Sequence, residues 1–285
     1  MIHYIENDCL RVGVKELGAE LTSIVSKETG SEFMWQGNPD IWSGQSPILF
    51  PIIGRLIDDK YTLNGKEYEM PKHGFARRML WECVHKTDNC VRFLLKDTED
   101  TLKIYPFSFE LTVTFSLEDN RLSVIHSVTN RGENMMYFSL GAHPAFNCKI
   151  GDKLVFEKNE TLDKIKIDLV HSLRLPETYP LLSNEREIVI TEDIFNEDAL
   201  ITKGVQSDEI TLVSEGLGRR ISFKLGHAPY LGIWAKPGVP YVCIEPWCGV
   251  NDEQDVRVDF SEKEGIIPLA SGEKFRFQWS AEFTE

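Results

Sequence analysis

The side chains best suited to acid–base chemistry in this sequence stand beside proline or glycine at the ends of apolar runs. The apolar run 241–244 leads into Glu245, and Pro246 follows it. Such a run is typical of a strand buried on both faces, and because proline cannot continue a hydrogen-bonded ladder, we expect the strand to end at Glu245. Burial would raise the pKa of this carboxyl group, which would suit it to act as a general base near neutral pH. The structural alternative is a carboxylate that is capped by backbone donors or paired with an arginine.

Two histidines could supply the proton donor that such a base requires. His143 precedes Pro144, which restricts the histidine backbone to extended angles and so gives the ring a defined direction. His73 precedes Gly74, in a stretch that we expect to form a loop at a strand end, where functional residues concentrate. Histidine is the natural donor or acceptor near neutral pH, but a loop histidine is often only solvated and a buried one often belongs to the core. His126 falls on an apolar face and is expected to be a core residue of this kind.

Arg55 is a candidate ligand-binding residue for a related reason. It follows the apolar run 48–53 and Gly54, whose lack of a side chain allows close approach to the backbone. Its guanidinium group could fork onto vicinal hydroxyls or a phosphate. Because 45 acidic residues stand against 31 basic ones, an ordinary ion pair with a carboxylate is the alternative.

These residues have to be positioned mainly by strands, because alternation of apolar and polar residues with period two dominates the sequence. The clearest pattern covers residues 109–129, where two long alternating segments flank a turn at Asp119-Asn120. A second hairpin is expected around Asn64-Gly65, the strongest two-residue turn signal in the chain. Further strands are expected at residues 9–14, 20–26, 79–85, 90–96, 135–140, 165–169, 210–214, 220–225, 230–234 and 275–283.

Helical signals are sparse. Thr191-Glu192-Asp193 could cap one short turn before Phe195, with acidic residues suited to the positive end of a helix. No stretch has the composition of a linker and no repeat of fixed period is present. We therefore expect one all-β domain over residues 1–285, with two packed antiparallel sheets and few short helices.

Composition narrows the classes of partner. The net charge of −14 disfavours nucleic acid and anionic membranes, both of which require clustered lysine and arginine. The first residues lack the basic and apolar segments of a signal peptide, and no apolar run has the length of a membrane helix. The six cysteines include no Cys-x-x-Cys pair, so neither a zinc site nor a redox motif is indicated. A cytoplasmic protein with reduced thiols is the expected class.

Taken together, these stretches resemble the aldose 1-epimerases, or galactose mutarotases. The resemblance rests on Arg55 after its Pro-containing apolar run and on three short motifs, which occur in the order found in that family: His-Gly-Phe-Ala-Arg at 73–77, Gly-Ala-His-Pro-Ala-Phe at 141–146, and Glu-Pro-Trp at 245–247. It covers nearly the whole chain. The resemblance implies a large antiparallel β-sandwich of the galactose mutarotase type, with a sugar bound in an open cleft and no metal or organic cofactor.

The resemblance also implies roles for individual residues. His143 would match the general acid and Glu245 the general base, with His73 as the second active-site histidine. Arg55 would match the substrate-binding arginine, and Asp198 the sugar-binding aspartate.

One position departs from the galactose enzymes, which usually carry asparagine before the arginine where this chain has Gly54. The chain is more similar to the lactose-operon-associated branch, and in part to the hexose-6-phosphate mutarotases. Arg77 beside Arg55 could hold a phosphate by bidentate contacts, and Arg78 is a second candidate.

The expected function is therefore interconversion of the α and β anomers of a hexose or a hexose phosphate, by a monomer or homodimer. Three other interpretations remain open. A metal-dependent oxygenase could use His73, His143 and Glu245 as ligands, although they lie 70 and 102 positions apart in sequence. A glycoside hydrolase needs two carboxylates about 5–10 Å apart, for which Asp198 is the available partner of Glu245. A sugar sensor would bind in the same pocket without turnover.

Overall fold

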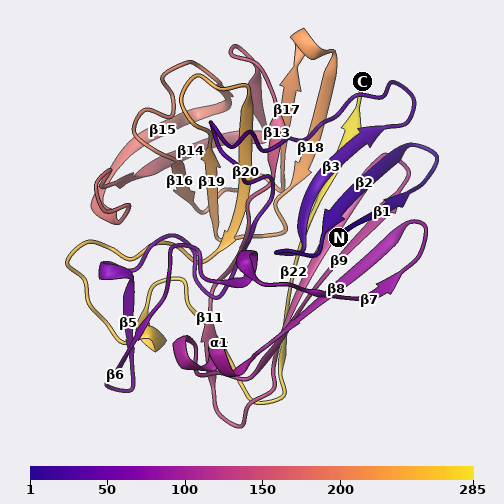
Figure 1. Cartoon of the computed structure of the whole chain (residues 1–285). Helices are drawn as coiled ribbons and strands as arrows, with labels where there is room; N and C mark the ends of the chain where they lie inside the picture. Colours follow the sequence, from indigo (N-terminus) through magenta and orange to yellow (C-terminus); the bar gives the residue numbers. More distant parts are fainter.

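The computed structural model describes residues 1–285, and β-strands dominate it (Figure 1). Strands account for 53% of the residues and helices for 6%, which confirms the predicted all-β class. The α-helix α1 (Glu99–Ile104) begins after Thr98, whose side chain accepts a hydrogen bond from the backbone N–H of Thr101. The remaining helical segments are single 3-10 turns: η1 (Ile57–Asp59), η2 (Ala76–Arg78), η3 (Glu215–Leu217) and η4 (Phe260–Glu262). No helix has the length and apolar character that spanning a membrane requires.

One 15-stranded antiparallel sheet forms the body of the molecule. Its main path runs in the spatial order β4-β12-β20-β19-β16-β14-β17-β18-β22-β10-β9-β8-β7, while β13 pairs with β20 and β15 with β14. The strands are β4 (Ile48–Leu49), β7 (Glu82–Lys86), β8 (Cys90–Lys96), β9 (Phe109–Glu118), β10 (Arg121–Asn130), β12 (Leu140–Ala142), β13 (Ala145–Asn147), β14 (Lys153–Ile167), β15 (Arg174–Val189), β16 (Leu200–Lys203), β17 (Glu209–Ser214), β18 (Arg219–Lys224), β19 (Tyr230–Trp234), β20 (Tyr241–Cys248) and β22 (Lys274–Thr284).

Three small antiparallel sheets complete the fold. They consist of β1 (Ile2–Glu6), β2 (Leu10–Lys15) and β3 (Glu20–Ser26); of β5 (Lys60–Leu63) and β6 (Lys66–Glu69); and of β11 (Met136–Phe138) and β21 (Ile267–Leu269). In Figure 1 the β1–β3 sheet lies on the same side of the molecule as β7, β8 and β9, and the β5–β6 hairpin projects from the opposite side.

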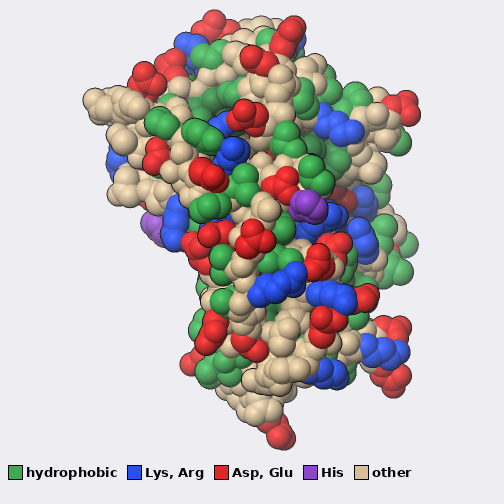
Figure 2. All heavy atoms as spheres, turned by 90° about the vertical axis from the view of Figure 1, so that its left-hand side faces the viewer, with side chains coloured by type: hydrophobic (Ala, Val, Ile, Leu, Met, Phe, Trp, Pro, Cys, Tyr) green, Lys and Arg blue, Asp and Glu red, His purple; other side chains and the backbone are tan.

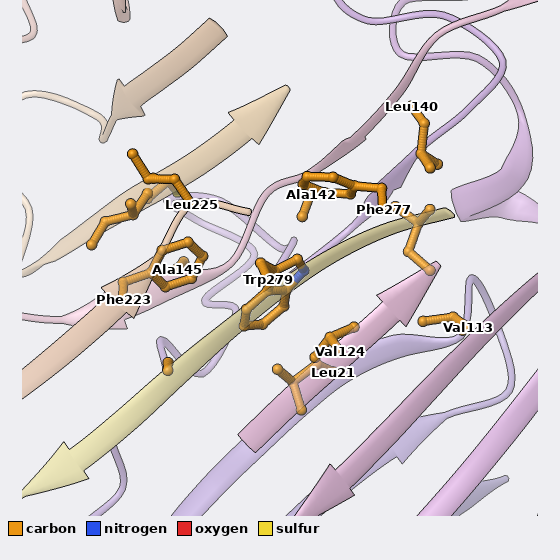
Figure 3. Packing of buried hydrophobic residues seen from close by; sticks show 14 of the residues in the cluster. Leu21, Val113, Val124, Leu140, Ala142, Ala145, Phe223, Leu225, Phe277 and Trp279 are labelled. Carbon is orange, nitrogen blue, oxygen red and sulfur yellow. The ribbon is translucent and has the colours of Figure 1, made fainter. Parts of the chain in front are cut away.

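The large sheet curls so that strands from its two halves face one another across the core. Phe146 of β13 packs against Phe223 of β18 and Phe283 of β22, with ring centroids 6.0 and 6.2 Å apart. Trp279 of β22 stacks on Phe223 at 5.0 Å, and Figure 3 shows it between Phe223 and Val124. Burial of these aromatic side chains supplies a large share of the hydrophobic stabilisation. The result is the large antiparallel β-sandwich that the sequence predicts.

The predicted hairpins are confirmed where alternation is regular. In β9 every second side chain from Phe109 to Leu117 is buried, and β10 returns directly after the Asp119-Asn120 turn. The β5–β6 hairpin turns at Asn64 and Gly65, whose φ angles of 50° and 78° are those that such a tight turn requires.

Two local expectations are wrong. Residues 191–193 do not start a helix, because the Thr191 hydroxyl donates a hydrogen bond to the Asp193 carboxylate instead of accepting one from the backbone, and the chain continues in turns. The strand expected at residues 165–169 is the end of the longer strand β14, which stops at Ile167. Its partner β15 has a mostly exposed surface and no regular alternation, so the pattern gave no sign of it.

Candidate active site

Glu245 lies in the interior of β20, so the prediction that this strand ends at the carboxylate is wrong. The strand continues through Pro246 to Cys248, and Leu231 of β19 is the partner of Pro246 on one edge. N–H groups alternate between the two edges of a strand, and that of Ile244 donates to the Pro144 carbonyl on the opposite edge. The nitrogen of Pro246 therefore faces this opposite edge, where the neighbouring ladder is interrupted. Proline is tolerated here because no hydrogen bond is lost.

The interruption also brings the predicted acid and base together. On this edge β12 pairs with β20 through Gly141 and Trp247, and β13 pairs with it through Ala145 and Cys243. The same register places His143, between β12 and β13, opposite Glu245. Directly opposed residues of an antiparallel pair project to the same face of the sheet. Accordingly, His143 Nε2 lies 3.2 Å from Glu245 Oε2.

Burial sets the protonation of this pair. His143 is 8% exposed and Glu245 1% exposed. Desolvation raises the pKa of Glu245 well above its usual value and lowers the pKa of His143 to about 3. The neutral carboxyl group and the neutral imidazole are therefore the favoured forms. Glu245 Oε2 and His143 Nδ1 are both buried without a hydrogen-bond partner.

On the edge of β20 that pairs with β19, a glycine leaves room for the side chain of Trp247. Glu245 faces Gly232 of β19 in the ladder. A Cβ atom at Gly232 would lie 2.8 Å from the indole ring of Trp247. The ring thus occupies the space above this glycine, beside the carboxyl group.

His73 joins the pair from the loop after β6, as the sequence predicts. Its ring centroid lies 6.0 Å from that of His143, with the two rings nearly perpendicular. The backbone N–H of Gly54 donates to His73 Nδ1 at 3.1 Å, so the proton of the neutral ring is on Nε2. Burial and the nearby Lys72 ammonium group lower the pKa of His73 well below its usual value. His73 is thus a neutral side chain whose Nε2–H can donate to a ligand.

Gly54, which directly precedes Arg55 in the sequence, packs against the side chain of Asn251. The glycine has a φ of +68°, and a Cβ atom built on it would lie 2.1 Å from Asn251 Cγ and Oδ1. Asn251 is held in place by two hydrogen bonds. Its side-chain Nδ2 donates to the Ser172 carbonyl at 2.7 Å, and its backbone carbonyl accepts from Arg174 Nε at 2.9 Å. The side-chain amide of Asn251 therefore lies beside Gly54, although the two residues are far apart in sequence.

Glu245, His143 and His73 border a cavity of about 360 Å³, a size that suits a single monosaccharide. Of the predicted site residues, His73, His143, Glu245, Asp198 and Arg77 all contribute to its wall. The full lining consists of Trp42, Lys72, His73, Arg77, His143, Ile167, Asp198, Ala199, Ile201, Trp234, Glu245, Trp247 and Asn251.

Arg55 is the predicted site residue that the structure does not bring into this lining. Its Nε atom lies 3.2 Å from Asp59 Oδ1, and the side chain is 38% exposed. The alternative interpretation of this arginine, an ordinary ion pair, thus describes its geometry here. Its positive charge nevertheless acts on Lys72 of the cavity wall, whose pKa it helps to lower.

Aromatic rings form one side of the cavity. Trp234 of β19 and Trp247 of β20 both line the cavity. Trp42 also lines it, with its ring centroid 5.1 Å from that of His143 and 5.6 Å from that of Tyr241. Such faces suit the C–H surface of a sugar. Trp42 was not predicted, because it belongs to a loop without periodic pattern.

Lys72 and Asn251 were also missed. Lys72 directly precedes His73, and this adjacency is the signal that could have identified it. Asn251 lies three residues after β20, where nothing in the local sequence indicates a contact with Gly54.

One group of side chains has donor atoms close enough to bind a metal ion. Atoms of His143, Cys243 and Glu245 lie within 4.8 Å of one another, and all three residues are buried. This set differs from the predicted oxygenase ligands because Cys243 takes the place of His73. Burial raises the pKa values of the Cys243 thiol and the Glu245 carboxyl group, so an ion would have to displace a proton from each.

Known proteins similar to this chain agree on one family. Residues 1–281 match the family model for aldose 1-epimerase. The plasmid-encoded protein LacX of Lactococcus lactis subsp. lactis is 30% identical over 292 residues, which cover 95% of this chain and 96% of LacX.

Two solved structures are similar over their whole length. A galactose mutarotase related enzyme from Lactobacillus acidophilus matches with a TM-score of 0.95 and 35% identity, over 100% of this chain and 98% of its own. A galactose mutarotase-like protein from Lactobacillus casei ATCC 334 matches with a TM-score of 0.95 and 32% identity, over 100% of both chains.

Proposed function

This chain belongs to the aldose 1-epimerase family, and we propose that it interconverts the α and β anomers of a hexose by acid–base opening and closure of the ring. The observation that carries the proposal is the contact of 3.2 Å between His143 Nε2 and Glu245 Oε2 beside a cavity sized for one monosaccharide. The reaction needs a base and an acid that exchange roles, and these two side chains hold one mobile proton between them.

In the proposed steps, every proton that one group gives up is taken up by another. Transfer within the pair gives a Glu245 carboxylate and a protonated His143. The carboxylate removes the proton from the C1 hydroxyl while the imidazolium protonates the ring oxygen, and the bond from C1 to the ring oxygen breaks. The open-chain aldehyde rotates about C1–C2 and closes on its other face, with the two side chains acting in reversed roles. Positioned groups of this kind each contribute about 10²- to 10⁴-fold to the rate.

The other residues of the cavity wall are proposed to hold the sugar. The Nε2–H of His73 is available as a donor, because Nδ1 is occupied by the Gly54 amide. Asp198 lines the cavity as a carboxylate that can accept from sugar hydroxyls, and one of its oxygens accepts from the Ala199 amide at 2.8 Å. Trp42 and Trp234 offer apolar faces.

The chemistry is proposed to proceed without a metal or organic cofactor, since the protons are carried by side chains. Treatment with a strong chelator is therefore expected to leave the rate unchanged. Loss of activity that is restored by one particular metal ion would favour a role for the His143, Cys243 and Glu245 group instead.

Polarimetry on freshly dissolved α-D-glucose and α-D-galactose tests the proposal, with the spontaneous rate subtracted. The wild-type protein is expected to accelerate the change in rotation, and Glu245→Gln to abolish most of that acceleration while remaining folded. A folded wild-type protein that accelerates no neutral or phosphorylated hexose would overturn the proposal and favour a sugar-binding protein without turnover.

A further inference from the structure

Two positively charged side chains of the cavity wall lack a partner of opposite charge. The Lys72 ammonium group lines the cavity and forms neither a salt bridge nor a hydrogen bond. Arg77 lines the same cavity and donates from Nη2 to the Lys72 carbonyl at 2.8 Å, while its Nε is buried without a partner. Neither residue forms a salt bridge, although the chain carries 45 acidic side chains.

These cations contrast with the charged side chains on the surface of the protein. In Figure 2 the lysine and arginine side chains of the visible face lie largely beside aspartate and glutamate side chains. Many such pairs have short contacts, as between Arg257 and Asp58 at 2.6 Å and between Lys164 and Glu197 at 2.7 Å. Acidic residues are therefore plentiful, and Asp198 lines the same cavity, yet none of them forms a salt bridge with Lys72 or Arg77.

The charges within the cavity leave it positive. Lys72 and Arg77 contribute two positive charges and Asp198 one negative charge. His73, His143 and Glu245 favour their neutral forms, because burial opposes charge on each of them. The net charge of the wall is therefore +1 in a protein whose overall charge is −14.

A cavity of this kind is costly to leave without an anion. Lys72 is largely desolvated, which opposes its charge; the nearby Asp198 carboxylate favours that charge, and the fields of Arg55 and Arg77 act against it. A neutral sugar could hydrogen-bond to these groups but would bring no countercharge into the low-dielectric site. An oxyanion would neutralise the ammonium group as a point charge and accept the planar fork of the guanidinium group.

We propose that Lys72 and Arg77 form an anion subsite, and that the preferred substrate is a hexose bearing a phosphate ester or a carboxylate. This inference rests on the proposed function and specifies its substrate class. A phosphate monoester carries a charge of about −1.5 to −2 near neutral pH, which matches two cations better than the single charge of a carboxylate does.

Anomer exchange measured by NMR can test the subsite. D-Glucose, D-glucose 6-phosphate and D-glucuronate share one ring configuration and differ at C6, and the galactose series gives the same comparison. For the wild-type protein, kcat/KM is expected to be higher for an anionic sugar than for its neutral counterpart by about 10-fold or more. The two anionic arms show whether the subsite prefers the phosphate or the carboxylate.

Lys72→Gln then tests the residue itself. It is expected to reduce the preference for the anionic over the neutral sugar by about 10- to 100-fold, mainly through KM of the anionic sugar. Arg78, the second phosphate-binding candidate from the sequence, is exposed and does not line the cavity, so Arg78→Gln removes a neighbouring positive charge outside the site and is the matched control. The control should keep the wild-type preference.

Two results would overturn the subsite while leaving the mutarotase proposal intact. One is a wild-type protein that turns over the neutral sugar as well as the anionic ones. The other is an equal loss for all sugars in Lys72→Gln. If no sugar is turned over, the function fails but the subsite is still decided by calorimetry, because tighter binding of glucose than of glucose 6-phosphate would contradict it.

Discussion

His143 and Glu245 face each other across the interrupted ladder between β20 and the β12–β13 segment, and their side chains approach to 3.2 Å. The sheet register that holds them is continuous on both sides of the gap. Strand pairing therefore fixes the backbone positions from which the two side chains project. Because each is buried and each contacts the other, we expect the two protonation equilibria to be coupled.

Such coupling predicts non-additive effects of mutation. Glu245→Gln and His143→Gln should each lower kcat by about 10²- to 10⁴-fold, because each variant removes one of the two groups between which the proton is transferred. The double variant should lose little more than the worse single variant, since the two groups act together. The measurement is the rate of anomer exchange by NMR, made on variants whose melting temperatures match that of the wild-type protein. If the reduction in kcat of the double variant equals the product of the two single reductions, the two groups act independently.

The pH dependence of kcat should reflect the one-proton form of the pair. Burial lowers the pKa of His143 to about 3, so a second proton adds only in strong acid, and it raises the pKa of Glu245, so the first proton is lost above that group's usual range. The rate should therefore stay level from about pH 7 down to about pH 5, where a histidine of ordinary pKa would titrate. Activity should fall on the alkaline side, as Glu245 loses its proton.

Stopped-flow or NMR rates, corrected for spontaneous mutarotation, give this profile. Circular dichroism at each pH confirms that the protein is folded. An acid limb centred near the pKa of free histidine would show that His143 is protonated more readily than its burial implies.

Gly54→Ala should destabilise the protein through its contact with Asn251. A Cβ atom there would lie 2.1 Å from the Asn251 side chain, an overlap that costs about 1–3 kcal/mol in addition to the strain of the positive φ. Gly30→Ala is the matched control, because Gly30 has a φ of +76° and nothing within 4 Å of the added atom. Denaturant unfolding should show a larger loss for Gly54→Ala than for the control.

The double variant Gly54→Ala with Asn251→Ala distinguishes the steric cause. Removal of the amide should recover the part of the loss that comes from overlap and leave the part that comes from φ. If the losses of the two single variants simply add, the contact is not the cause.

Buried histidines should make the fold sensitive to acid. His126 is 1% exposed and stacks on Phe277, and burial lowers its pKa to about 3. A group whose pKa is depressed in the folded state contributes stability that is present above its unfolded pKa and is lost as pH falls. For His126 the loss reaches about 2 kcal/mol at about pH 5, relative to neutral pH.

His126→Phe should therefore reduce the drop in unfolding free energy between neutral and acidic pH by about this amount. His85→Gln, at an exposed position, is the control for the loss of a histidine. Denaturant titrations at the two pH values provide the measurement. An unchanged drop in His126→Phe would contradict the linkage.

The sequence predicted those parts of the fold in which one strand face is buried. Buried and partly exposed residues alternate regularly in β9 and over most of β10, and the sequence pattern reproduced both strands. In β15 most side chains are exposed on both faces, so no period appears. The helix α1 was missed because its cap pairs Thr98 with Thr101, without the glutamate or glutamine that usually marks such a cap.

For the site, short motifs located the side chains but not their mutual geometry. The proline after Glu245 was interpreted as a strand end. It is accommodated inside β20 because the facing ladder is interrupted there, and this interruption arises only when β12 and β13 both pair with β20 in the folded chain. The amide of Asn251 against Gly54 joins positions that are far apart in sequence. Contacts of this kind follow from tertiary packing and leave no local pattern.

The position of Glu245 inside a strand with neighbours on both edges has a consequence for how relatives of this protein can diverge. Backbone amides in such central strands exchange with solvent only when much of the molecule unfolds, whereas surface loops open far more easily. The proposed reaction centre thus includes a residue of a central strand, while Trp42 and Asn251 reach the cavity from connecting segments. Insertions and replacements in these segments can alter which sugar is accepted and leave the proton-transfer pair in place.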